Sequence, residues 1–181
     1  DGVCQQLAGI DYLLTAMIAS APPAQQRDLL EVRTLVEATL RDTSLMAAWL
    51  LPLSHHPEGL GAGLAELRRT VVATRTLQFD VDCDAELARE LPPATAAALF
   101  ALVQAASLHA LTASTAGQLL IRIERAAHGA RACIEVDNTR FTDATADVEL
   151  RALRYRARRV GARLMFEAVA ASHSRCSIGF A

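Results

Sequence analysis

Two polar side chains at the start of the chain, Asp1 and Gln5, stand four residues apart. On a helix this spacing places both of them on one face. Two polar side chains that share a face could take part in the same chemistry. The alternative is that Asp1 caps the helix and that Gln5 is a solvated polar residue.

Other candidates for chemistry carry less information. His55 and His56 could bind a metal ion, but they lie in a stretch of linker composition, where a solvated pair is the favoured interpretation. The sequence contains neither a GxSxG elbow nor a Walker loop. Four cysteines lie far apart and form no CxxC pair: Cys4, Cys83, Cys133 and Cys176. We therefore expect no metal site and no disulfide framework, and a reducing cytoplasm as the compartment.

The composition narrows the class of protein. A chain of 181 residues can bury one substantial core, or one compact domain with a small helical appendage. It is 52% hydrophobic but only 4% aromatic, which favours helices. A formal net charge of −2 gives no reason to expect binding to nucleic acid or to an anionic membrane. The longest strongly apolar run, Leu45 to Leu53, contains Pro52 and is too short to span a bilayer, so we expect no membrane contact from this segment.

The first 55 residues read as two helices. Apolar residues recur at spacings of four and three and predict one seam along the first helix: Val3, Leu7, Ile10, Leu14 and Met17. This helix should end near Ala21-Pro22-Pro23. A second helix continues the pattern to Pro52, with Leu29, Val32, Val36 and Leu40 in its seam. The two helices should form an antiparallel hairpin.

A two-helix hairpin cannot cover both of its seams by itself. A second copy packing against it would form a four-helix bundle, so we expect a homodimer through the hairpin. The alternative is that the hairpin packs on the remainder of its own chain.

The remaining chain, residues 56–181, predicts helices interleaved with strands. Helices are expected at about 59–73, 94–113 and 148–160. Strands are expected at about 76–82, 162–168 and 175–180, together with a strand hairpin that turns at His128-Gly129. This order gives an α+β sandwich with a mostly antiparallel sheet.

Several short sequence motifs, in their order along the chain, resemble those of a known family. Asp1-Gly2-Val3-Cys4-Gln5-Gln6-Leu7 is similar to the segment directly after the phosphoacceptor histidine in a His-Asp-x-x-x-Gln motif, and Val103-Gln104-Ala105-Ala106 resembles the start of an asparagine-box helix. Leu153 to Arg158, Gly161 and Leu164 look like the helix and strand after a second glycine box. Together they resemble the C-terminal core of the nitrate-sensor and lipid-sensor type of two-component sensor histidine kinase.

The resemblance implies a role for each part. Residues 1–55 would be the hairpin for dimerisation and phosphotransfer, and residues 56–181 the histidine-kinase-type ATPase domain. Asp1 would polarise a histidine just before it, and Gln5 would orient water for attack on the aspartyl phosphate of a response regulator. The partner would be the receiver domain of that regulator, and the location would be cytoplasmic, including the cytoplasmic part of a membrane-bound sensor.

The nucleotide motifs of the resembling family are eroded here. At the positions of its base and its magnesium ligand stand Ala105 and His109, and imidazole is a poor magnesium ligand. Asp137 and Asn138 match the adenine-reading glycine box, where Asp137 could still contact adenine, but Thr139 replaces a glycine. The alternatives are that His109 is an ordinary helix residue and that Asp137-Asn138 is a turn after a strand.

The second glycine box aligns with the segment from Asp147 to Leu150, which places carboxylates where backbone amides should cradle phosphates. The last glycine-rich turn is replaced by Ser172-His173-Ser174. We therefore expect no cofactor, with ATP and Mg²⁺ as ligands if the nucleotide site is functional.

This sequence is compatible with three functions. The first is a dimeric histidine-kinase-like protein that acts on a response regulator as phosphatase or phosphotransfer partner, with impaired ATP binding. The second is an active ATP-dependent sensor histidine kinase. The third is a non-enzymatic docking module.

Overall fold

The computed structural model describes residues 2–56, 58–74, 76–112, 116–127, 129–137, 148–170 and 173–180. The chain divides into two compact units, Asp1–Leu50 and Leu51–Ala181. The boundary that the sequence suggests, between residues 55 and 56, therefore falls inside the second unit. The reason is that Leu53–His55 form a short 3-10 helix, η1, while the buried Gln104 amide donates a hydrogen bond of 3.1 Å to the carbonyl oxygen of Leu51.

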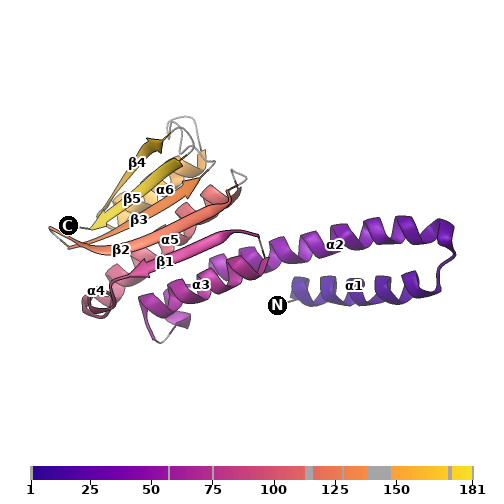
Figure 1. The fold of residues 1–181 in the computed structure, drawn as a ribbon. Coiled ribbons are helices and arrows are strands. Elements are labelled where there is room, and N and C mark those ends of the chain that lie inside the picture. The colour runs from indigo at the N-terminus through magenta and orange to yellow at the C-terminus, as the bar shows by residue number, and fades with distance from the viewer. Residues whose placement is uncertain are drawn as a thin grey trace. The chain divides into compact units, whose positions relative to one another are not determined.

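The first unit is the helical hairpin that the sequence predicts (Figure 1). Helix α1 spans Gly2–Ser20 and helix α2 spans Pro23–Leu50. Proline at the first helical position of α2 loses no helical hydrogen bond, because that N–H has no partner in any helix. The Gln26 amide closes the connection by donating to the Ala21 carbonyl at 3.0 Å.

Helix α2 covers only part of the apolar seam of α1. Leu14 is buried against α2 and Leu7 is partly covered, whereas Val3, Ile10 and Met17 remain exposed. The reason is geometric. At about 100° per residue, Leu7 and Leu14 lie on one side of the seam and Val3, Ile10 and Met17 on its other side, so a single neighbouring helix covers the first two and leaves the other three exposed.

The second unit is built on a five-stranded sheet with the order β1-β2-β3-β5-β4. Its strands are β1 (Gln78–Cys83), β2 (Gln118–Ala126), β3 (Gly129–Asp137), β4 (Ala162–Ala170) and β5 (His173–Phe180). Strand β1 pairs with β2 in parallel and all the other pairs are antiparallel. The predicted α+β sandwich with a mostly antiparallel sheet is confirmed.

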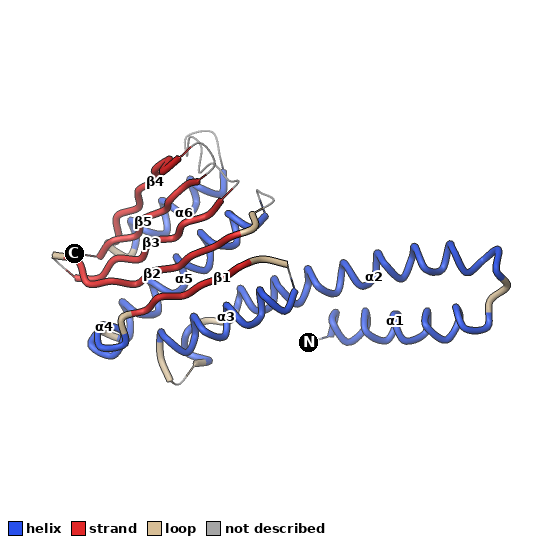
Figure 2. The backbone as a smooth tube through the Cα atoms, viewed as in Figure 1, coloured by secondary structure: helices blue, strands red, loops and turns tan. Residues whose placement is uncertain are grey.

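Helices α3 (Leu60–Thr74), α4 (Ala85–Glu90), α5 (Pro93–Thr112) and α6 (Val148–Arg159) complete the unit. Figure 2 shows α5 and α6 behind the sheet, where they cover one face of it. The core forms between these two layers from alternate strand residues and the buried sides of the helices, and it includes Phe79, Phe100, Leu119, Ile121, Ile134, Leu150 and Ile178. Of the described helices, only α5 is long and apolar enough to span a membrane, and it is 61% buried, as a core helix would be.

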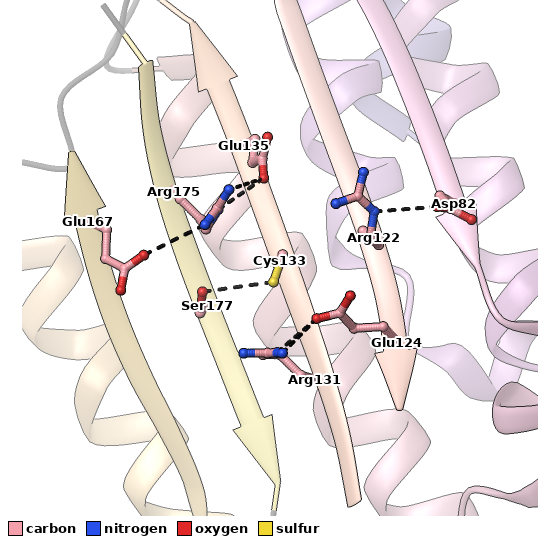
Figure 3. A network of polar contacts seen from close by, with 9 residues as sticks. All are labelled: Asp82, Arg122, Glu124, Arg131, Cys133, Glu135, Glu167, Arg175 and Ser177. Carbon is pink, nitrogen blue, oxygen red and sulfur yellow. Dashed lines mark hydrogen bonds and ion pairs between the residues drawn. The ribbon is translucent and has the colours of Figure 1, made fainter. Parts of the chain in front are cut away.

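The other face of the sheet carries polar side chains instead of helices (Figure 3). Ion pairs connect neighbouring strands across it: Arg122 with Asp82, Arg131 with Glu124, and Arg175 with both Glu135 and Glu167. Strands with one apolar and one polar face alternate in sequence, which is why the periodicity predicted them well.

Helix α4 has no counterpart among the helices predicted from the sequence. This helix has six residues and is too short to show a helical periodicity of apolar residues, but its N-cap residue can be recognised in the sequence. The carboxylate of Asp84 accepts hydrogen bonds of 3.0 Å from the backbone N–H groups of Glu86 and Leu87. An aspartate at this position satisfies amides that have no partner inside the helix.

Candidate functional site

The first candidate group lies on α1. The side chain of Gln5 is exposed, and Asp1 lies outside the described residues. At about 100° per residue, Gln5 and the exposed Tyr12 lie on one flank of α1, while Val3, Ile10 and Met17 lie on the opposite flank. A partner could therefore approach Gln5 without contacting Val3, Ile10 or Met17.

The second group joins α5 to α6. His109 lies in the last turn of α5 and Glu149 in the first turn of α6. The imidazole Nδ1 of His109 lies 2.8 Å from Oε2 of Glu149. The His109 side chain is 10% exposed and that of Glu149 is 71% exposed. The glutamate therefore covers the histidine at the end of α5 on the side that faces solvent. Packing of α5 on α6 thus brings together two positions that the sequence assigned to separate nucleotide motifs.

The contact between His109 and Glu149 is electrostatically favourable without a bound ligand. A carboxylate in the first turn of a helix is stabilised by the helix dipole and by the unpaired N–H groups there. Glu149 therefore stands where an anion would otherwise be favoured at the start of α6. A phosphate at this place would meet a negative charge that is already bonded to His109.

Asp137 ends β3 and connects it to the start of β2. Its Oδ1 atom accepts hydrogen bonds of 2.8 Å from the backbone N–H groups of both Gly117 and Gln118. A Cβ atom on Gly117 would lie 3.3 Å from Oδ2 of Asp137, so glycine leaves room for the carboxylate. Asp137 is the residue predicted to contact adenine, and its Oδ1 atom is thus used to hold the ends of β2 and β3 together.

The other predicted positions are scattered or undescribed. Ala105 is half-buried on α5 and has no group that could accept a proton, while His173 and the buried Ser174 begin β5. Asn138, Thr139, Asp147 and Ser172 lie outside the described residues. Among the residues that are described, no group of three or more His, Cys, Asp or Glu side chains could hold a metal ion.

Sequence reasoning missed one polar anchor, Gln104. This side chain is buried, and its bond to Leu51 attaches the start of the second unit to the core helix α5. A glutamine in a largely apolar helix, within the segment that resembles the asparagine-box helix, was the available signal.

A helical hairpin followed by this helix-covered, mostly antiparallel sheet is the fold of the histidine kinase core. The histidine kinase domain of the Erythrobacter litoralis EL346 blue-light activated histidine kinase matches with a TM-score of 0.55 and 14% identity, over 94% of each chain. A bacterial phosphotransferase matches with a TM-score of 0.60 and 14% identity, over 97% of this chain and 89% of that chain.

The longer EL346 kinase structure matches with a TM-score of 0.54 and 16% identity, over 96% of this chain and 58% of that chain. No protein-family model and no curated protein sequence matches this chain. The similarity is therefore one of fold.

Proposed function

We propose that this protein works in two-component signalling as a dimeric, cytoplasmic, histidine-kinase-like partner of a response regulator. It acts on the phosphoryl group of the receiver domain as phosphatase or phosphotransfer partner, and its own ATP binding is impaired. The proposal joins the fold to the residues that remain, Asp1 and Gln5, and to those that have changed in the nucleotide motifs.

The contact between His109 and Glu149 is the observation that carries impaired ATP binding. Phosphoryl transfer from ATP needs oxygen ligands for magnesium and donors that face the phosphates. At the two positions that resemble those of the family stand an imidazole and a carboxylate, and Nδ1 of His109 lies 2.8 Å from Oε2 of Glu149. A bound nucleotide would have to break this contact, and its phosphates would lie near a negative charge. Both effects weaken nucleotide binding.

Exposure of Gln5 supports action on a receiver domain. Its amide is free to hold a water molecule against a partner that approaches this flank of α1. The match in fold to a bacterial phosphotransferase is compatible with phosphotransfer.

Calorimetric titration with Mg²⁺ and a non-hydrolysable ATP analogue tests the nucleotide half of the proposal. We expect no binding up to millimolar nucleotide. The variant Glu149→Gln keeps the side-chain volume but removes the charge, so it separates charge repulsion from the loss of the glycines. Micromolar binding by the unchanged protein would overturn the proposal and favour the autokinase.

The lifetime of a phosphorylated receiver domain tests the other half. Receiver domains from the same genome are phosphorylated with acetyl phosphate, and the loss of phosphoryl group is followed with and without the dimer. We expect the dimer to shorten the lifetime and Gln5→Ala to abolish the effect, whereas Gln25→Ala, an exposed glutamine on α2, leaves it intact. An unchanged lifetime across the whole set would refute action on the phosphoryl group.

A further inference from the structure

A groove lies between α6 and the beginning of β4, far along the chain from Gln5. Its lining comes from one side of the helix and from the first residues of the strand: Arg154, Arg158, Ala162, Arg163, Leu164 and Met165. Gly161 positions these walls. It adopts a φ of +75°, which lets the chain turn from the end of α6 directly into β4.

Positive charge is concentrated on α6 and at the start of β4, and three of the arginines there line the groove. Helix α6 carries five arginines and a single acidic residue, Glu149, which contacts His109; Arg163 adds a sixth arginine at the start of β4. None of these six forms an ion pair with a carboxylate among the described residues. By contrast, Arg122, Arg131 and Arg175 on the sheet all do. The excess is local, because the whole chain has a formal net charge of −2.

The strand beside the groove has an open edge. In the sheet order β4 is terminal and pairs only with β5, so the opposite edge of its nine residues has no strand partner in the described chain. Met165 and Val169 on this strand are exposed. A long edge strand with exposed apolar side chains is a template for pairing with another strand unless something covers it.

Side chains along β4 alternate between two surfaces. Phe166 lies on the α6 side, where the Arg154 guanidinium stands 5.4 Å from the centre of its ring. Glu167 lies on the polar face, where it pairs with Arg175 (Figure 3). A strand added beside β4 would alternate in the same way. Half of its side chains would meet Arg154 and Arg158, and the other half would pass Arg163 and Met165.

We propose that this face binds an acidic, extended segment of a partner protein, which adds to the sheet beside β4 and places its carboxylates on Arg154, Arg158 and Arg163. Arginine and methionine are the residue types enriched in protein interfaces, and main-chain pairing supplies affinity in this mode of recognition. The stacking of Arg154 on Phe166 reduces the freedom that its guanidinium would lose on binding. The inference goes beyond the proposed function and does not depend on any action on phosphoryl groups.

Nucleic acid and anionic membranes are the competing anionic partners. Both would be attracted by the arginines, but neither uses the free hydrogen-bonding edge of β4 or its apolar side chains. A partner with carboxylates and a pairing-competent backbone uses the charge, the edge and Met165 together, so the observations favour a protein segment.

Fluorescence anisotropy tests the proposal with the full chain and a labelled peptide of nine residues, the length of β4, in which pairs of glutamates alternate with pairs of valines, so that both faces of the strand carry carboxylates. Two comparison peptides carry glutamine in place of glutamate, or a central proline that cannot pair as a strand. We expect the acidic peptide to bind and both comparison peptides to bind at least about tenfold more weakly, which is the scale of one lost charge-assisted bond.

Two variants of equal charge locate the site. Arg158→Glu with Arg163→Glu changes the groove, whereas Arg156→Glu with Arg159→Glu makes the same change on the same helix outside its lining. We expect the first pair of substitutions to weaken peptide binding at least about tenfold and the second to leave it nearly unchanged. Thermal unfolding of both variants confirms that they fold.

Three results would overturn the proposal. Equal losses in the two variants would show unspecific attraction, and equal binding of the proline peptide would exclude an added strand. Tighter binding to duplex DNA or to anionic vesicles, lost in the groove variant, would assign the arginines to the other class of partner.

Discussion

Dimerisation through α1 gives the sharpest test of how the hairpin is used. Val3, Ile10 and Met17 are 58%, 44% and 53% exposed in the single chain. Complete burial of such a side chain contributes about 1.5–3 kcal/mol, so covering the exposed half contributes about 1 kcal/mol. Three residues on each of two protomers then supply about 6 kcal/mol, and Leu13 on the same flank adds to it.

The substitution Ile10→Asp should dissociate this dimer. It removes the apolar contribution in both protomers, about 2 kcal/mol, and places two carboxylates in the seam at about 1 kcal/mol or more each. The total of about 4 kcal/mol raises the dissociation constant of the dimer about a thousandfold. The hairpin itself should persist, because Leu14 and the ion pair between Arg33 and Asp11 hold α1 on α2.

Sedimentation equilibrium over a range of concentrations measures the change, and circular dichroism checks that the helices remain. Tyr12→Asp is the matched control, because Tyr12 is 77% exposed on the opposite flank of the same helix. A dimer of unchanged affinity in Ile10→Asp, or a monomeric parent protein, would refute the assignment of this flank to a second copy.

Three further predictions concern the second unit and are measured by urea unfolding. Asp137→Ala should lower the free energy of unfolding by about 1–3 kcal/mol, because two backbone N–H groups lose their charged acceptor; a loss near zero would contradict this structural role. Gly161→Ala should cost about 1–2 kcal/mol, because alanine is strained at a φ of +75°, and the control Gly179→Ala, at an ordinary φ with open space around it, should not share that strain. Burial raises the pKa of the Cys176 thiol, so above pH ~8.5 the unfolded chain releases a proton that the folded chain keeps, and stability should fall as pH rises. Cys176→Ala should flatten that slope, and an unaltered slope would show that another group causes it.

The local elements of this protein were accessible from sequence because their signals are local. Alternation at Leu119, Ile121 and Ile123 predicted β2, and the proline pair after Ala21 marked the end of α1. The short helix α4 escaped because six residues contain less than two turns of any helical pattern.

Only part of the candidate site could be predicted from the sequence. Resemblance to a family pointed to His109, Asp137 and Glu149 as positions in separate motifs. It could not show that His109 and Glu149 bond to each other, or that Asp137 holds the backbone at Gly117. Each of these contacts joins residues at least 20 positions apart, and their geometry is fixed only when α5, α6 and the sheet pack together.

The sequence by itself determined the helices other than α4, the strands, the mostly antiparallel class of the sheet and the location of the arginines, because hydrophobic periodicity and charge are properties of neighbouring residues. The tertiary structure alone decided which α1 side chains face α2, which strand forms the open edge and which arginines share a groove. Those outcomes depend on strand order and on the rotation of each helix about its axis. Both are set by packing between distant segments, where a rotation of tens of degrees moves an apolar side chain from the core to the surface.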